Sequence, residues 1–136
     1  MKEFALDARL EQDSLLLLRL SLCELRLSKD ARWPWLILVP QRADVSEITD
    51  LKPLDQVMLT FEIETASAAL KKVTNPTKIN IGALGNIVRQ LHVHIVARFE
   101  GDPGWPGPVW GHGVAEAYDA EKQEELMMRI REALSS

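Results

Sequence analysis

Two histidines stand at alternate positions in the segment QLHVHIV, which spans residues 90–96. Side chains alternate between the two faces of a strand, so Gln90, His92 and His94 would share one face while the apolar residues between them face the core. Imidazole changes its charge near neutral pH, and it can attack an electrophile, accept a proton or donate one. The spacing therefore predicts that the reactive groups of this chain lie together on one strand.

The whole-chain properties limit the classes of protein to consider. With 136 residues, the chain is long enough for a buried core, and we expect a single domain over residues 1–136. A net charge of −4 gives no basic field for a nucleic-acid partner. No apolar run reaches the roughly 18 residues of a membrane span, and the N-terminus lacks the apolar stretch of a signal peptide. The single cysteine, Cys23, has no partner in the chain, so we expect a core residue and a cytoplasmic location.

The first forty residues contain apolar patterns of two periods. The pattern from Phe4 to Leu18 indicates a short helical start, and the alternation from Leu16 to Leu27 indicates a strand with a bulge. Residues 33–39 predict a buried strand that Pro40 ends, because proline cannot donate to a ladder. The short connection between the two strands favours an antiparallel hairpin.

A long helix is predicted next. Asp50 can cap it, Pro53 falls in its first turn, and Asn75-Pro76 ends it. Apolar and small residues recur at helical spacing and predict one stripe along the helix. The members of this stripe are Leu54, Val57, Met58, Phe61, Thr65, Ala68 and Ala69.

The second half of the chain begins and ends with regular elements. We expect a short strand at 78–81, a glycine loop at 82–86 and the histidine strand at 89–99, followed by an irregular tryptophan-rich loop and a closing helix at 119–134. Strands and helices are segregated along the chain rather than strictly alternating. This arrangement predicts the α+β class, with an antiparallel sheet and helices on one side.

Segment 90–96 resembles the signature of the histidine-triad (HIT) family, in which three histidines occupy alternate strand positions. Three further features are similar and follow in the family's order: an apolar strand that ends at Pro40, Asn80 on the strand before the histidines, and Gly85-Asn86 in a loop like the one that wraps a phosphate. The resemblance covers about residues 20–99 and weakens through the tryptophan-rich loop. It is most similar to bacterial diadenosine tetraphosphate hydrolase-like members.

The resemblance implies a HIT-like fold, an antiparallel sheet of about five strands with a long helix and a C-terminal helix. It also implies a homodimer that pairs through the long helix and a sheet edge. The expected partner is a nucleotide, with no nucleic acid and no membrane, and neither a cofactor nor a protein-bound metal takes part in the chemistry.

The chemistry that the resemblance implies is cleavage at the α-phosphate of a nucleotide. His92 would attack the phosphorus and form a nucleotidyl-histidine intermediate, and splitting one displacement into two makes each step easier. The substrate would be a dinucleoside polyphosphate or a nucleoside phosphoramidate, and the protein a nucleotide hydrolase or nucleotidyl transferase. His94 would assist the leaving group. The phosphate and nucleoside contacts would come from Asn80, Gly85, Asn86 and Trp105.

The chain departs from the family pattern at three positions. The first triad residue is Gln90, which keeps a donor and an acceptor but cannot titrate. Many members have a histidine where this chain has Trp35, and the two changes agree because a proton relay would need both partners. Ile87 stands where a polar residue would contact phosphate.

Two other functions are compatible with the same residues. One is a nucleotide-binding module of this family with little or no catalysis, which the changes at Gln90 and Trp35 favour. The other is a His-x-His metal-binding protein of the cupin-like kind. A metal site would need a third ligand, and Glu100 lies further from His94 than the cupin-like interval. We expect His112, between two glycines, to be a surface residue and Trp33 to be a packing residue.

Overall fold

The structure is a computed structural model, and it describes residues 2–135. Five antiparallel strands form one sheet in the order β1-β2-β3-β5-β4. The expected α+β class and five-stranded sheet are confirmed. The strands are β1 (Ser14–Arg19), β2 (Cys23–Ser28), β3 (Trp35–Pro40), β4 (Lys78–Gly82) and β5 (Val93–Arg98).

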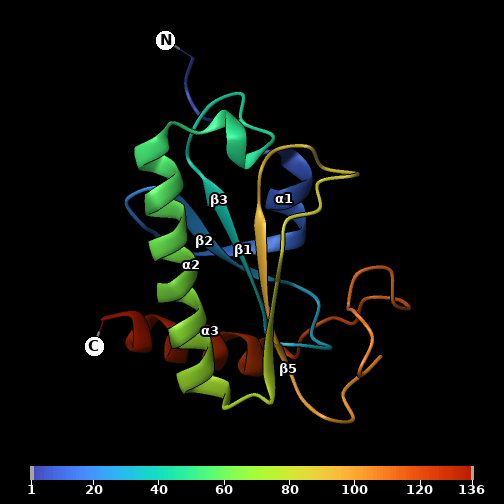
Figure 1. Cartoon of the computed structure of the whole chain (residues 1–136). Coiled ribbons are helices and arrows are strands. Elements are labelled where there is room, and N and C mark those ends of the chain that lie inside the picture. Colours follow the sequence, from blue (N-terminus) through green and yellow to red (C-terminus); the bar gives the residue numbers. More distant parts are fainter. Residues whose placement is uncertain (1, 136) are drawn as a thin grey trace.

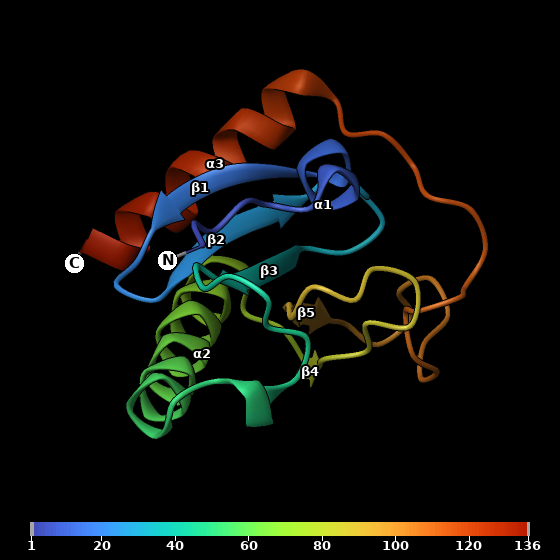
Figure 2. The same ribbon diagram turned by 90° about the horizontal axis from the view of Figure 1, so that it is seen from above.

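Three helices and one 3₁₀ turn accompany the sheet. They are α1 (Ala8–Asp13), η1 (Ile48–Asp50), α2 (Pro53–Thr74) and α3 (Ala120–Ser135). Figure 1 shows α1 and α2 on opposite sides of the strands. Figure 2 shows the long segment between β5 and α3, in orange, running out past one end of the sheet before the chain returns to α3. None of the helices within residues 2–135 has the length and hydropathy to cross a membrane.

The main core lies between the sheet and the helices α2 and α3. Alternate strand residues face it, and they pack against Leu59 and Leu70 of α2 and Ile130 of α3. The strand residues of this face include Leu25, Leu27, Leu36, Leu38, Val93, Ile95 and Ala97. Cys23 belongs to the same core, as expected, and burial raises the pKa of its thiol. The protonated thiol is therefore a packing group.

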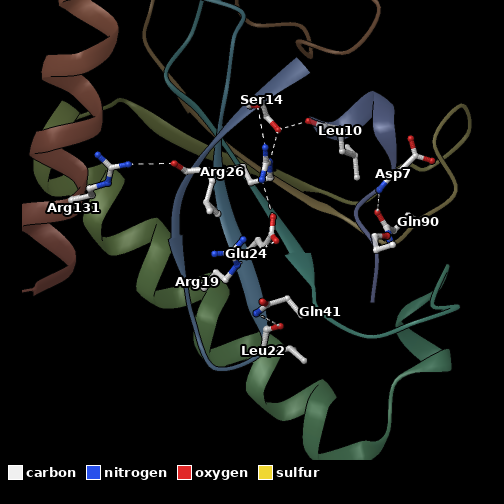
Figure 3. A network of polar contacts seen from close by, with 12 residues as sticks. Asp7, Leu10, Ser14, Arg19, Leu22, Glu24, Arg26, Gln41, Gln90 and Arg131 are labelled. Atoms are coloured by element: carbon white, nitrogen blue, oxygen red, sulfur yellow. Dashed lines mark hydrogen bonds and ion pairs between the residues drawn. The ribbon is translucent and has the colours of Figure 1, made fainter. Parts of the chain in front are cut away.

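The N-terminal segment covers part of the other face of the sheet. Leu10 of α1 packs against Ile37 and Val39, with Phe4 and Leu6 beside them. At the end of α1, the Ser14 hydroxyl accepts a hydrogen bond from the buried Arg26 guanidinium at 2.7 Å, as Figure 3 shows. Arg26 also forms an ion pair with Glu24 at 2.8 Å. These charged groups are buried but paired.

The predicted strand at 16–27 is wrong as a single element, because it is a hairpin of β1 and β2. The expected bulge is present and lies between Leu16 and Leu18. The reversal between the strands contains no glycine or proline. Its amides at Leu22 and Cys23 donate to the buried Glu62 carboxylate of α2, at 2.9 and 2.8 Å. A contact from a distant helix therefore stabilises this turn, and no local pattern marks it.

The long helix begins at Pro53 and ends at Asn75, which has a left-handed backbone with φ of 49°. Asp50 does not cap this helix; its carboxylate accepts the amides of Ser46 and Glu47 in the preceding turn. The predicted apolar stripe mostly faces outward, since Leu54 and Phe61 are 83% and 64% exposed. The buried residues lie on a neighbouring row of the helix, so α2 carries an unburied apolar face.

The histidine strand is shorter than residues 89–99. It begins at Val93, because the Leu91 amide donates to the Val45 carbonyl at 2.9 Å rather than to a neighbouring strand. Gln90 and His92 thus precede β5. The first turn of α2 and the whole of α3, by contrast, agree with the predicted positions to within a residue or two.

Candidate active site

The register of the sheet places His94 on an interior strand, between β3 and the edge strand β4. His94 pairs with Ile37 of β3 on one side and with Gly82 of β4 on the other. Trp35 lies two residues before Ile37, so its side chain is on the same face and diagonal to His94. The alternation that the sequence predicts for Leu91, His92, Val93 and His94 is present, with the apolar residues in the main core.

His92 and His94 lie together, with ring centroids 4.8 Å apart. The Nδ1 atom of His92 is 2.7 Å from the carbonyl oxygen of Gln90. A carbonyl only accepts hydrogen bonds, so in the neutral ring Nδ1 carries the proton and Nε2 keeps its lone pair. His92 therefore has the tautomer and orientation that a nucleophilic imidazole needs.

The tautomer of His94 is fixed in the opposite sense. Trp35 Nε1 lies 2.9 Å from His94 Nδ1, and an indole N–H only donates. Nδ1 is therefore the acceptor, and the proton of the neutral ring sits on Nε2. Burial, together with the charge of the neighbouring His92, lowers the pKa of His94 to about 4. With both rings neutral, the pair presents the lone pair of His92 Nε2 and the N–H donor of His94 Nε2.

Trp110 completes an aromatic cluster around His94. Its ring lies 5.6 Å from that of His94 and 6.5 Å from that of Trp35. Gly82 gives it room, since a Cβ atom there would come within 3.1 Å of the Trp110 ring. The sequence predictions missed Trp110; the concentration of tryptophans in its loop was the only signal available.

Two cavities meet at His92. The larger, of about 530 Å³, lies between α1, β3 and the segment 115–117. Its lining includes Leu10, Trp35, Ile37 and His94 besides His92. The smaller, of about 200 Å³, lies between η1 and the loop that follows β4, and Gly85 is part of its wall. His92 thus lies between a large, partly apolar space and a smaller one.

The predicted glycine loop borders this smaller cavity. Gly85 has a φ of 73°, a conformation that glycine adopts without strain. Within residues 2–135, the amides of Gly85, Asn86 and Ile87 donate to no protein acceptor. Unpaired amides beside a cavity can bind an anion. Asn86 is exposed and lines neither cavity, so of the two predicted loop residues only Gly85 borders the smaller cavity.

The Gln90 side chain is bound to the N-terminal segment, which covers the histidine face of the sheet, and it lines neither of the two cavities. Its Oε1 accepts the Asp7 amide at 2.8 Å, and its Nε2 donates to the Ala5 carbonyl at 2.9 Å. Figure 3 shows the side chain directed at Asp7. Its backbone carbonyl, rather than its side chain, contacts His92.

Asn80 and Trp105 belong to a neighbouring cluster rather than to the cavities. Arg98 is almost fully buried and pairs with Asp102 at 2.8 Å. It also donates to the Asn80 side-chain oxygen at 3.1 Å and lies 5.6 Å from the Trp105 ring. The structure therefore does not bring either residue to the histidine pair. As expected, His112 is at the surface and Trp33 is a packing residue.

The structure gives the metal-binding alternative no third ligand. Among residues 2–135, no group of three histidine, cysteine, aspartate or glutamate side chains is placed to hold a metal ion. Both histidines also have their Nδ1 atoms occupied by protein partners.

Comparisons with known proteins point to one family. Residues 9–101 match the family model described as HIT domain. A histidine triad (HIT) protein from Sinorhizobium meliloti 1021 is 61% identical, with a TM-score of 0.94 and 96% of each chain covered. A histidine triad protein from Bradyrhizobium japonicum is 44% identical, with a TM-score of 0.96 and coverage of 98% of this chain and 99% of that one.

A curated relative matches over a shorter stretch. An AP-4-A phosphorylase from Mycobacterium tuberculosis (strain CDC 1551 / Oshkosh) is 37% identical over 73 residues. The match covers 49% of this chain and 37% of that protein. The chain therefore spans little more than a third of this relative's length.

Proposed function

Since residues 9–101 match the HIT domain, the chain belongs to the HIT family, and from this premise we propose that it is a nucleotide hydrolase or nucleotidyl transferase. The reaction is cleavage at the α-phosphate of a nucleotide. The observation that supports it is the Nε2 atom of His92, whose lone pair is free because the Gln90 carbonyl holds the proton on Nδ1. His92 lines both cavities.

The proposed reaction has two displacements at phosphorus. Nε2 of His92 forms a bond to the α-phosphorus, and the bond to the leaving group breaks with its electron pair going to that group. The Nδ1 proton stays on the ring and its hydrogen bond to Gln90 stabilises the positive charge that develops. In the second step an acceptor oxygen attacks phosphorus, the N–P bond returns its electron pair to Nε2, and the acceptor's proton leaves to solvent.

The two cavities suit different parts of a nucleotide substrate. The larger has apolar walls at Leu10, Trp35 and Ile37, and it suits a nucleoside. The smaller has Gly85, whose amide is unpaired, in its wall, and it suits phosphate oxygens. Preorganised donors of this kind contribute about 3 kcal/mol each to transition-state stabilisation. Asn80 and Trp105, which lie outside both cavities, are not assigned substrate contacts in this proposal.

The substrate is a dinucleoside polyphosphate or a nucleoside phosphoramidate. The relative named AP-4-A phosphorylase supports the former, and its name also points to phosphate as an acceptor beside water. Turnover should therefore be measured with and without inorganic phosphate. A cytoplasmic location stays a proposal; it is supported by the unpaired, buried Cys23.

Mass spectrometry of the intact protein tests the function and the residue together. After brief incubation with diadenosine polyphosphates and nucleoside phosphoramidates, the protein should gain the mass of one nucleoside monophosphate unit. His92→Ala should gain none, and His112→Ala, which removes an exposed histidine, should behave as the unchanged protein does. Nucleotide binding without adduct or product at any pH would instead favour the non-catalytic binding module.

We further propose that the protein is a homodimer that pairs through α2 and the β4 edge. The outward residues of α2 include Leu54, Val57 and Phe61, at 83%, 54% and 64% exposed. β4 is an edge strand of the sheet, and its Ile81 is 51% exposed. An apolar helix face next in sequence to an unpaired strand edge is compatible with a second copy of the chain.

A further inference from the structure

We propose that Trp35 is a specificity-determining residue. By donating its indole N–H to Nδ1 of His94, it keeps His94 as a neutral hydrogen-bond donor and restricts the protein to leaving groups that depart without a proton. This inference rests on the proposed function and names the substrate class within it. The protein should cleave phosphoanhydrides far better than phosphoramidates.

The geometry around Nδ1 of His94 decides which ring nitrogen is left for the substrate. Trp35 Nε1 is 2.9 Å from this atom, and the two rings are 5.5 Å apart at an interplanar angle of 63°. Trp35 is itself packed edge-on against Trp33 and Trp110, with ring centroids at 6.0 and 6.5 Å. The indole can neither accept a hydrogen bond through its nitrogen nor release its proton at working pH. The only nitrogen of His94 left for substrate is Nε2, which carries a hydrogen.

A second proton on His94 would have to enter at Nδ1. The Trp35 N–H already points there, so protonation would replace a hydrogen bond by two opposed N–H groups. A histidine in place of Trp35 would behave differently, because an imidazole nitrogen can accept a hydrogen bond from a protonated partner. The tryptophan therefore removes a proton relay rather than merely weakening it.

The charged groups around the larger cavity do not supply a counter-ion for a protonated His94. Those that line it come from α1, from the β2–β3 connection and from the segment before α3: Arg9, Asp13, Lys29, Asp30 and Glu116, besides His92. Asp30 is paired with Arg32 at 2.8 Å, and within residues 2–135 no carboxylate forms a hydrogen bond or ion pair with His94. An imidazolium at this position would be buried without a counter-ion, and burial accordingly lowers the pKa of His94 to about 4.

This arrangement separates leaving groups by their basicity. When the N–P bond forms at His92, the electron pair of the breaking bond goes to the leaving atom. A phosphate oxygen can hold that charge and accept a hydrogen bond from His94 Nε2, so no proton has to move. An amine would leave as a strongly basic anion unless an acid protonated it. A general acid raises the rate about 10²- to 10⁴-fold, and cleavage of a phosphoramidate in this site lacks that acceleration.

The test uses a series of adenosine 5′-phosphate aryl esters in which ring substituents vary the basicity of the leaving oxygen with little change of shape. The slope of log(kcat/KM) against leaving-group pKa reads out whether a proton is supplied. We expect a steep slope for the unchanged protein and a shallower one for Trp35→His. Diadenosine tetraphosphate should be cleaved at least about 100-fold faster than adenosine phosphoramidate, and Trp35→His should narrow that ratio at least about tenfold.

Two further variants separate this role from packing. Trp35→Phe keeps an aromatic ring but has no N–H, so it should also flatten the slope. Trp33→Phe is the matched control, because its indole donates to the Pro103 carbonyl outside the cavities, and it should leave the slope unchanged. A ¹⁵N NMR spectrum of the unchanged protein needs no variant and should show the Nε2–H tautomer at His94.

The outcomes separate the two proposals. Two results would overturn the role of Trp35 while the proposed function stands. One is equal turnover of the phosphoanhydride and the phosphoramidate. The other is a slope of log(kcat/KM) against leaving-group pKa that neither Trp35→His nor Trp35→Phe changes. An Nδ1–H tautomer at His94 would overturn it as well. If no substrate is cleaved and no adduct forms on His92, the proposed function itself fails, and the inference fails with it.

Discussion

The side-chain oxygen of Gln90 accepts a hydrogen bond from the backbone amide of Asp7 at 2.8 Å, although 83 residues separate the two in the chain. The side-chain nitrogen of Gln90, Nε2, donates to the Ala5 carbonyl at 2.9 Å. An amide side chain can make both bonds at once because it carries a donor and an acceptor. The first triad position of this chain therefore anchors the N-terminal segment that leads into α1, which forms one wall of the larger cavity.

The first prediction is that Gln90→Ala loosens the N-terminal segment and leaves the orientation of His92 intact. Two hydrogen bonds are lost, which should lower the free energy of unfolding by about 1–2 kcal/mol. The Gln90 carbonyl still orients His92, so KM should rise more than kcat falls. Denaturant unfolding, steady-state kinetics and hydrogen exchange at residues 5–10 measure these effects. A large loss of kcat with unchanged exchange would instead indicate a direct role of the side chain in the reaction.

Local patterns predicted the parts of this molecule that local chemistry determines. Pro40 marked the end of β3, Asn75 the end of α2, and the alternation at 91–94 placed one histidine pair on one face. Each of these signals depends on residues that are neighbours in sequence. The family membership could be recognised from the same short motifs, since their order along the chain is preserved.

The features that sequence reasoning missed all depend on distant partners. The β1–β2 turn is stabilised by Glu62, some forty residues away. Gln90 is directed by backbone groups of the N-terminal segment, and Trp110 reaches His94 only because the loop after β5 folds back over Gly82. Asn80 looked suited to phosphate, but the buried Arg98 engages its oxygen. None of these partners is marked by a local period or a turn residue.

The second prediction concerns the backbone of the loop that contains Gly85, to which we propose that phosphate binds. Gly85→Ala places a Cβ on a residue with φ of 73°, which costs about 1 kcal/mol of stability, and it should displace the unpaired amides. Turnover should fall at least about tenfold, as expected when a preorganised donor is misplaced. Kinetics and thermal unfolding of the variant measure both effects.

Gly101→Ala is the matched control for this loop. Gly101 has a φ of 82° and no atom within 4 Å of an added Cβ, so the backbone cost is similar while the site is untouched. It should lose comparable stability and keep its turnover. Equal losses of turnover in both variants would show that the Gly85 loop has no specific part in binding phosphate.

The third prediction is a pH dependence of stability that comes from His94. Its pKa is about 4 in the folded protein, against 6.5 for the ordinary group. Between these values the unfolded chain binds a proton that the folded protein does not bind. The free energy of unfolding should therefore fall as the pH falls from about 6.5 to about 4, by up to about 3 kcal/mol, and this contribution is fully retained above pH 6.5.

Denaturant unfolding across this range measures that loss. The carboxyl groups of Asp7, Asp30, Asp50 and Asp102 have pKa values below their usual 3.8, so their contribution to stability is lost mainly below pH 4. His94→Gln should flatten the curve between pH 4 and 6.5, whereas His112→Gln, which removes an exposed histidine, should leave the fall in place. A slope that persists unchanged in His94→Gln would assign the effect to other groups.

The last prediction concerns the outward face of α2. If this face pairs with a second copy, Phe61→Glu should dissociate the dimer, because it would place a charge inside an apolar interface. The Phe61 side chain is 64% exposed when one copy of the chain is considered alone, so the substitution should leave the monomer folded. A stable interface buries about 1,200–2,000 Å² in total, and the proposed interface therefore includes the β4 edge besides the α2 face. Light scattering coupled to size-exclusion chromatography measures the mass, and Thr60→Glu, also exposed but on another row of the helix, is the matched control. We expect a monomer for Phe61→Glu and a dimer for both Thr60→Glu and the unchanged chain; a monomer in all three cases would mean that this apolar face serves some other contact.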